Sequence, residues 1–234
     1  MKKRNKVLII IPAHNEEASI EKTISSIKGY DYIVINDGST DQTKQILEKN
    51  HFNHVNLYFN LGIGGAVQTG YKYAYQNDYD IAVQFDADGQ HDAGSIESLI
   101  QPIIKNEADF TIGSRFIKKN SDNFKSSFLR RMGIRLISNT IFLFSKKRIY
   151  DTTSGFRAAN KAIIEHFADH YPKEYPEPIS DFELIRLGFK IEEVPAKMHE
   201  RKAGKSSIHS WKSAYYVFNV LLSILILKVR RIKK

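Results

Sequence analysis

Two carboxylates one residue apart are the clearest candidates for chemistry in this sequence. Asp86 and Asp88 directly follow a mostly apolar run, 81–85, and Gln90 comes two positions later. Carboxylate and amide oxygens are hard ligands that suit Mg²⁺ or Mn²⁺, and two carboxylates on one turn can share such an ion with a diphosphate. The spacing therefore predicts a divalent-cation site at Asp86, Asp88 and Gln90. The alternative is a solvated turn whose aspartates cap a helix.

Polar residues also follow two other apolar runs. Asp37 comes after the run 32–35, where a carboxylate can accept hydrogen bonds from the ribose or base of a nucleotide. Its alternative role is to cap the next helix. The glycine-rich turn 62–65 lets backbone amides approach a ligand closely. It matches neither a P-loop nor a full dinucleotide-binding fingerprint, because Val67 stands at the third glycine position, so by itself it indicates only the start of a helix.

The elements that must position these residues alternate regularly in the first half of the chain. Short apolar runs at 7–11, 32–35, 55–59, 81–85 and 110–112 predict strands, and helical spacing predicts helices near 20–27, 40–50, 62–75 and 95–104. This alternation indicates βαβ units and a largely parallel sheet covered on both faces. Ligands bind beyond the carboxyl ends of the strands in such sheets, so the polar clusters are expected to face one cleft.

The second half is less regular. Residues 151–157 predict a polar loop, and 171–178 predicts another because it holds three of the six prolines. Ser180 is a candidate cap for a helix through Leu187, and 191–194 predicts a late strand. The chain has no cysteine, which excludes disulfides, thiolate metal ligands and a cysteine nucleophile. One domain with a C-terminal appendage is the simplest organisation.

Four segments together resemble family 2 glycosyltransferases of the GT-A fold. They are IPAHNEE at 11–17, VINDGSTD at 34–41, NLGIGGA at 60–66 and DADGQH at 86–91. Within that family, GSR at 113–115, SGFR at 154–157 and RKAGKSS at 201–207 resemble the branch of dolichol-phosphate mannosyltransferases and bacterial polyprenyl-phosphate glycosyltransferases. The resemblance implies an α/β, Rossmann-like GT-A fold with a mostly parallel central sheet flanked by helices. It would span residues 1–207, with a nucleotide-sugar half at 1–115 and an acceptor half at 116–207.

The resemblance also implies roles for individual residues. Those expected to bind the nucleotide sugar are Pro12, His14, Glu16, Asp37, Gly64, Asp86, Ala87, Arg201 and Lys205, the last two in a basic loop that closes over the donor diphosphate. Asp86, Asp88 and Gln90 match the metal site, which implies Mg²⁺ or Mn²⁺ as cofactor. Arg115, Ser154 and Arg157 match positions around the acceptor phosphate. The candidates for a part in catalysis are Asp88, Arg115, Arg157 and Asp181.

Two departures from the mannosyltransferase pattern bear on the donor. Gly89 replaces a usual apolar residue, and 175–183 is more similar to bacterial undecaprenyl-phosphate glucosyl- and N-acetylhexosaminyltransferases. Both favour a UDP-sugar. The predicted activity is an inverting, metal-dependent transfer of glucose or an N-acetylhexosamine to polyprenyl (undecaprenyl) phosphate. This acceptor is already anionic, so it needs no strong general base, and arginines suit the binding of its phosphate.

Three alternatives stay open. The first is transfer to a sugar hydroxyl in polysaccharide synthesis, for which Asp181 or Glu183 would be the candidate base. The second is a GDP-mannose-dependent polyprenyl-phosphate mannosyltransferase. The third is a non-catalytic scaffold that binds a nucleotide sugar.

The net charge of +9 is unevenly distributed. Residues 115–150 and 201–234 each carry a net +9, whereas 1–114 and 151–200 carry −5 and −4, so no nucleic-acid partner is predicted. The apolar run 215–227 is shorter than the roughly 20 residues that span a bilayer. We therefore predict a basic, apolar interfacial helix at 208–234 on the cytoplasmic face of the cell membrane. The amphipathic stretch 124–144 either joins this membrane surface or packs on the domain. The alternative for the C-terminal helix is contact with a small membrane-protein partner or with a second copy of the chain.

Overall fold

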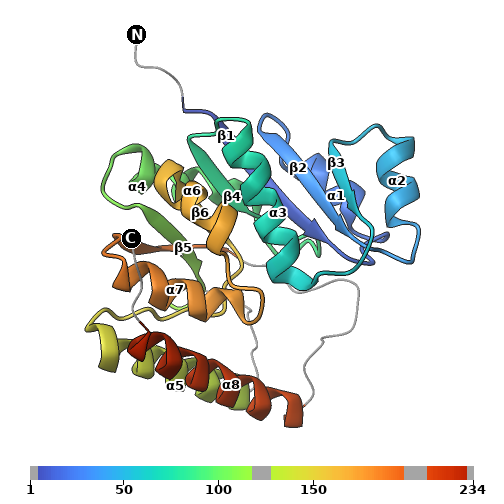
Figure 1. The fold of residues 1–234 in the computed structure, drawn as a ribbon. Helices are drawn as coiled ribbons and strands as arrows, with labels where there is room; N and C mark the ends of the chain where they lie inside the picture. Colours follow the sequence, from blue (N-terminus) through green and yellow to red (C-terminus); the bar gives the residue numbers. More distant parts are fainter. Residues whose placement is uncertain (1–4, 118–127, 198–209, 231–234) are drawn as a thin grey trace.

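The computed structural model describes residues 5–117, 128–197 and 210–230, with backbone only at 128–130 and 210–213. Its centre is a seven-stranded sheet in the order β3-β2-β1-β4-β6-β5-β7 (Figure 1). The strands are β1 (Val7–Ala13), β2 (Asp31–Asp37), β3 (His54–Leu57), β4 (Ile81–Gln84), β5 (Phe110–Ser114), β6 (Arg157–Asn160) and β7 (Ile191–Pro195). All neighbours are parallel except β6, which runs antiparallel to β4 and β5. The predicted mostly parallel sheet is confirmed.

Helices cover both faces of this sheet. They are α1 (Ile20–Ser26), α2 (Thr43–Lys49), α3 (Gly62–Gln76), α4 (Ile96–Ile104), α5 (Phe128–Ser145), α6 (Lys161–His170), α7 (Pro176–Arg186) and α8 (Ser210–Val229), with a 3-10 turn, η1 (Ala93–Ser95), before α4. Successive strand side chains point to opposite faces. Leu8 and Ile10 of β1 therefore pack with α3 and α6, while Ile9 and Ile11 pack with α1, α2 and α4. Two apolar faces explain why the strands are continuous apolar runs in the sequence.

Helices α5, α7 and α8 form a separate apolar cluster. Its fully buried members are Ile137 and Ile141 of α5, Phe182 of α7, and Val220 and Ile224 of α8. Figure 1 shows α5 and α8 side by side, with α7 between them and the sheet. The described part of the stretch 124–144 thus lies in α5, which packs one face on the domain as an amphipathic helix. Of the helices that the structure describes, none combines the length and the apolar character that a bilayer crossing requires.

Three sequence-based expectations about the second half need correction. Ser180 does not cap a helix but lies inside α7, whose N-cap is Tyr175. The predicted loop 171–178 ends early, because α7 already begins at Pro176; proline fits the first turn of a helix, where its missing N–H would have no partner. Strand β6 directly follows the polar segment 151–156 and is only four residues long, so its pattern is too short to indicate a strand. The predicted boundary between residues 207 and 208 lies outside the described residues.

Candidate active site

The carboxyl ends of β2, β1 and β4 are neighbours in the sheet, and the polar segments that follow them meet there. Nδ1 of His14 lies 2.8 Å from the carbonyl oxygen of Asp37, and the side-chain nitrogen of Asn60 lies 3.2 Å from Nε2 of the same imidazole. The carboxylate of Asp37 is 3% exposed and accepts a hydrogen bond of 2.7 Å from the N–H of Leu61. These contacts join the segments after β1, β2 and β3 into one polar edge.

Three other predicted donor-binding residues have local contacts of their own. Pro12 is buried inside β1, and the carboxylate of Glu16 accepts a hydrogen bond of 2.6 Å from the hydroxyl of Ser19. At Gly64, a Cβ would lie 2.3 Å from the carbonyl oxygen of Lys173, so glycine is what lets α3 approach that segment. The contribution of these three residues to donor binding stays a prediction.

Asp86 and Asp88 stand on the turn after β4. The backbone N–H of Asp86 donates to Nδ1 of His91 at 3.0 Å, and Nε2 of that ring lies 3.5 Å from Oδ2 of Asp86. Oδ1 of Asp88 accepts a hydrogen bond of 3.0 Å from the N–H of Gln90. Ala87, between the two aspartates, is buried. About a third of the Asp86 side chain is exposed (34%), so this turn presents carboxylate oxygens to solvent while its backbone is held from within.

The donors on this turn fit a hard divalent cation that is bound together with a substrate. Within the described ranges, no three His, Cys, Asp or Glu side chains are grouped so that they could hold a metal ion. Mg²⁺ commonly takes one or two protein carboxylates and completes its shell with water and substrate phosphates. Asp86, Asp88 and the amide of Gln90 supply ligands of this kind and number.

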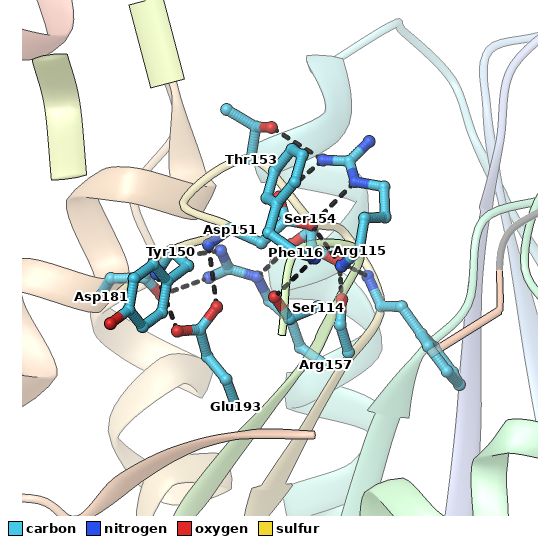
Figure 2. Close-up of polar contacts among 12 residues, drawn as sticks. Ser114, Arg115, Phe116, Tyr150, Asp151, Thr153, Ser154, Arg157, Asp181 and Glu193 are labelled. Carbon is cyan, nitrogen blue, oxygen red and sulfur yellow. Dashed lines mark hydrogen bonds and ion pairs between the residues drawn. The ribbon is translucent and has the colours of Figure 1, made fainter. Parts of the chain in front are cut away.

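Figure 2 shows the two predicted acceptor arginines, each facing a carboxylate. Arg115 follows β5 and is 6% exposed; its Nε and Nη2 donate to the two carboxylate oxygens of Asp151 at 2.7 and 2.6 Å. Nη2 also donates to the hydroxyl of Thr153. Glu193 of β7 accepts hydrogen bonds from the N–H groups of Tyr150 and Asp151, at 2.7 and 2.8 Å, and so fixes the loop that carries Asp151.

Arg157 begins β6 and is 1% exposed. Nη1 and Nη2 donate to the carboxylate of Asp181 at 2.9 and 3.3 Å, and Nη1 also donates to the hydroxyl of Ser180. Nε donates to the carbonyl oxygen of Ser154, whose own hydroxyl donates to the carbonyl of Gly113 at 2.7 Å. The arginine therefore ties the SGFR segment to α7, and Ser154 ties it to β5.

Burial governs the ionisation of this second cluster. Desolvation raises the pKa of Asp181 from 3.8 to about 7, although the positive charge of Arg157 acts in the opposite direction. Burial disfavours the charge on Arg157, but attraction to Asp181 and Glu177 outweighs it and raises the pKa of the guanidinium. The site thus contains a buried carboxyl group that can change its charge near neutral pH while its arginine stays charged.

The structure brings some functional candidates together that sequence reasoning missed. Asp151 lies in the predicted polar loop, where a carboxylate gives no signal of a special role. Glu193 lies in the predicted strand 191–194, and a charged residue inside an apolar run is the one signal that could have drawn attention to it. His91 is part of the DADGQH segment, but no spacing argument predicts that its ring folds back on Asp86. Arg201 and Lys205 lie outside the described residues.

Comparison with known proteins identifies the family. The description "Glycosyl transferase family 2" applies to a family profile that matches residues 8–168, more than half of the chain. The chain belongs to glycosyl transferase family 2. It is therefore a glycosyltransferase, as predicted.

Two relatives of this family 2 chain have names that state a polyprenyl phosphate as a substrate. It is 34% identical over 214 residues to the UDP-N-acetylglucosamine–dolichyl-phosphate N-acetylglucosaminyltransferase of Methanococcus voltae, which covers 82% of this chain and 84% of the relative. It is 28% identical over 228 residues to the undecaprenyl-phosphate mannosyltransferase of Micrococcus luteus, with 92% of each chain covered. The resemblance to the polyprenyl-phosphate branch is confirmed.

A solved structure confirms the fold. Glucosyl-3-phosphoglycerate synthase from Mycobacterium tuberculosis, in complex with Mn²⁺, UDP-glucose and phosphoglyceric acid, matches 94% of this chain and 80% of its own with a TM-score of 0.71. The sequence identity of 17% makes this a likeness of fold alone. The expected GT-A architecture is thereby confirmed for this family 2 glycosyltransferase.

Proposed function

We propose that this glycosyltransferase moves glucose or an N-acetylhexosamine from a UDP-sugar to a polyprenyl phosphate, such as undecaprenyl phosphate, on the cytoplasmic face of the membrane. The observation that carries the proposal is the match to the M. voltae transferase over most of both chains, because its name gives both a UDP-sugar and a lipid phosphate. Gly89 and the segment 175–183 favour the same donor class.

The donor would lie at the carboxyl ends of β1, β2 and β4. His14 and Asp37 would meet the base and ribose there, and Arg201 and Lys205 would add positive charge around the diphosphate. Asp86, Asp88 and Gln90 would hold Mg²⁺ or Mn²⁺, which when bound neutralises charge that develops on the leaving diphosphate. The M. tuberculosis synthase, which shares this fold, is a complex with Mn²⁺ and UDP-glucose, and the proposal takes the same kinds of cofactor and donor.

Arg115, Ser154 and Arg157 would bind the acceptor phosphate. A phosphate monoester is anionic at neutral pH, so it can attack the anomeric carbon in line, with inversion, without a strong base. Both guanidinium groups are paired with carboxylates, and a direct contact with phosphate requires one of these hydrogen bonds to be exchanged for a phosphate oxygen. Protonation of Asp181 near neutral pH would leave the charge of Arg157 available for that exchange.

The outward faces of α5 and α8, which we call the α5–α8 face, would lie on the membrane. Its exposed large apolar side chains are Met132, Leu136, Phe142, Leu143, Tyr215, Phe218, Leu222, Leu225, Ile226 and Val229. Exposed Arg131, Arg135, Lys228 and Arg230 stand among them and suit anionic lipid. Asn219, which interrupts the apolar run, donates a hydrogen bond of 3.1 Å to the hydroxyl of Tyr175. Side chains of this kind favour a helix pair in the plane of the interface.

This arrangement supports a division of labour along the chain. Residues 1–207 would form the catalytic domain, with donor and acceptor halves that meet near residue 115, and 208–234 would serve as the interfacial segment. A small membrane protein or a second copy of the chain would compete with lipid for the same apolar face.

A transfer assay tests the proposal. The purified full chain is incubated with Mn²⁺, undecaprenyl phosphate and a panel of radiolabelled nucleotide sugars. An organic-soluble, acid-labile product from a UDP-sugar is the expected result, and the absence of such a product with every UDP-sugar would contradict it. GDP-mannose belongs in the panel because the M. luteus relative is a mannosyltransferase. Label that enters only a water-soluble glycan would instead indicate a hydroxyl acceptor, with Asp181 as candidate base.

A further inference from the structure

The carboxylate of Asp86 is enclosed by three residues that are not part of the proposed metal site. They are His91 from the same turn, Gln84 from the end of β4, and Gly155 from the loop before β6. We propose that His91 is a positioning residue, which together with Gln84 and Gly155 fixes the orientation of Asp86 for a divalent cation. The inference rests on the proposed function, because it concerns the same metal site.

His91 contacts Asp86 twice through one ring. Its side chain is 3% exposed, and its ring packs against Phe85 and Phe156, with ring centroids 5.3 and 5.0 Å away. Nδ1 accepts the backbone N–H of Asp86, so the ring proton is on Nε2, which lies 3.5 Å from Oδ2 of Asp86. One buried ring thus accepts the backbone N–H of Asp86 and lies against the carboxylate of the same residue.

Gln84 faces the other carboxylate oxygen. Its Nε2 lies 3.5 Å from Oδ1 of Asp86, and its Oε1 accepts a hydrogen bond of 3.3 Å from the hydroxyl of Tyr171. Gln84 is fully buried, and Tyr171 is 4% exposed, so this amide has a fixed orientation. Oδ1 of Asp86 therefore accepts from a buried amide, Oδ2 lies beside the His91 ring, and the exposed part of the side chain faces solvent, where a ligand could reach it.

Gly155 closes the third side by its lack of a side chain. A Cβ at this position would lie 2.7 Å from Oδ2 and 3.1 Å from Oδ1 of Asp86, and 3.2 Å from Nε2 of Gln84. Gly155 is not among the glycines with positive φ, so its backbone conformation is open to alanine. A side chain is excluded at this position by the nearby carboxylate of Asp86, and not by the backbone conformation of Gly155. The SGFR segment in the acceptor half thus touches the metal turn of the donor half.

Partners of this kind have measurable effects on metal sites. Mg²⁺ and Mn²⁺ need ligands at defined positions, and loss of an outer partner typically lowers metal affinity about 10-fold to 100-fold. His91→Phe keeps an aromatic ring between Phe85 and Phe156 but removes both nitrogens. His91→Asn keeps an acceptor near the position of Nδ1, and Gly155→Ala displaces the carboxylate from the opposite side.

The experiment measures ligand binding by the full chain. Mn²⁺ affinity is measured with saturating UDP by the electron paramagnetic resonance of the free ion, and UDP affinity without metal is measured by calorimetry. We expect about 10-fold to 100-fold weaker Mn²⁺ binding by His91→Phe and Gly155→Ala, a smaller loss for His91→Asn, and unchanged metal-free UDP affinity. His54→Phe, a histidine substitution on β3 outside these contacts, is the matched control and should match the wild type.

Each outcome has a distinct meaning. Unchanged Mn²⁺ affinity in folded His91→Phe and Gly155→Ala would overturn the inference and leave the proposed function intact. A loss of metal-free UDP binding in parallel with Mn²⁺ binding would also overturn it, since that indicates general damage to the fold. If His91→Phe does not fold, Gly155→Ala and His91→Asn decide. A wild-type chain that binds neither UDP nor Mn²⁺ with UDP contradicts the proposed function itself.

Discussion

Two regions of the site differ in how they place charge: the proposed donor side at the turn after β4, and the proposed acceptor side around Arg115 and Arg157. On the donor side, Asp86 keeps 34% of its side chain exposed at the end of β4. On the acceptor side, Arg115 and Arg157 are 6% and 1% exposed, and each is paired with a fully buried aspartate. The proposed donor side exposes a carboxylate that could receive a cation, whereas the arginines of the proposed acceptor side are paired from within and would have to exchange hydrogen bonds to hold a phosphate.

Removal of a carboxylate from the donor side has the largest expected effect. Asp88→Ala should lower the rate of sugar transfer by about 10³-fold, because the cation that would neutralise the leaving diphosphate loses one of its proposed ligands. Initial rates at saturating Mn²⁺ give the measurement. Asp92→Ala removes a nearby carboxylate that only caps η1, and it should retain transfer. Full activity of Asp88→Ala would contradict the metal assignment.

Separation of the buried pair on the acceptor side should affect folding first. Arg157→Met leaves Asp181 buried without its partner, which typically lowers the free energy of unfolding by about 3–5 kcal/mol. The double variant Arg157→Met/Asp181→Leu should recover most of this stability in urea denaturation and still lack transfer. Recovery of both stability and transfer would show that Arg157 acts only in the fold.

Asp181 should also make the acceptor side sensitive to pH. Burial raises its pKa to about 7 in the folded protein, while the unfolded chain titrates near 3.8. Between these values the folded state holds a proton that the unfolded chain has released, so stability falls as pH rises from about 4 to 7 and then levels off. Glu177 and Glu193, whose pKa values burial also raises, act in the same direction.

Chemical denaturation at pH 5 and pH 7.5 measures this dependence. The wild type should lose more stability between the two pH values than Asp181→Asn, which has no carboxyl group to titrate at that position. Equal losses in the two proteins would contradict a raised pKa at Asp181.

The α5–α8 face gives the smallest expected effect, since its proposed role is access to a membrane acceptor and not the chemistry. Leu222→Ser/Ile226→Ser should weaken flotation with anionic vesicles by about 10-fold, because two exposed apolar side chains are lost. Transfer to a water-soluble short-chain acceptor should not change. Tyr58→Ser removes a 97% exposed aromatic side chain from another surface and is the matched control. Equal loss of flotation in the control would argue against a specific membrane face.

The two sides also differ in how much of them could be predicted. The alternation of strands and helices as far as β5, and the polar turns at Asp37 and Asp86, follow from local patterns that span a few residues. The predicted loop 171–178 extends too far, because α7 already begins at Pro176, and β6 is absent from the prediction, because a four-residue strand gives little local information. The pairs Arg115–Asp151 and Arg157–Asp181 join residues 36 and 24 positions apart, which no spacing pattern specifies.

The sequence by itself determined the α/β class, the family resemblance and the turn that carries Asp86 and Asp88, since each depends on apolar periodicity or on short contiguous motifs. Only the tertiary structure decided that each arginine is paired with a buried carboxyl group, that His91, Gln84 and Gly155 surround Asp86, and that α5 packs beside α8. The reason is physical. Burial and electrostatic pairing depend on which distant segments the sheet brings into contact, and that is a property of the whole fold.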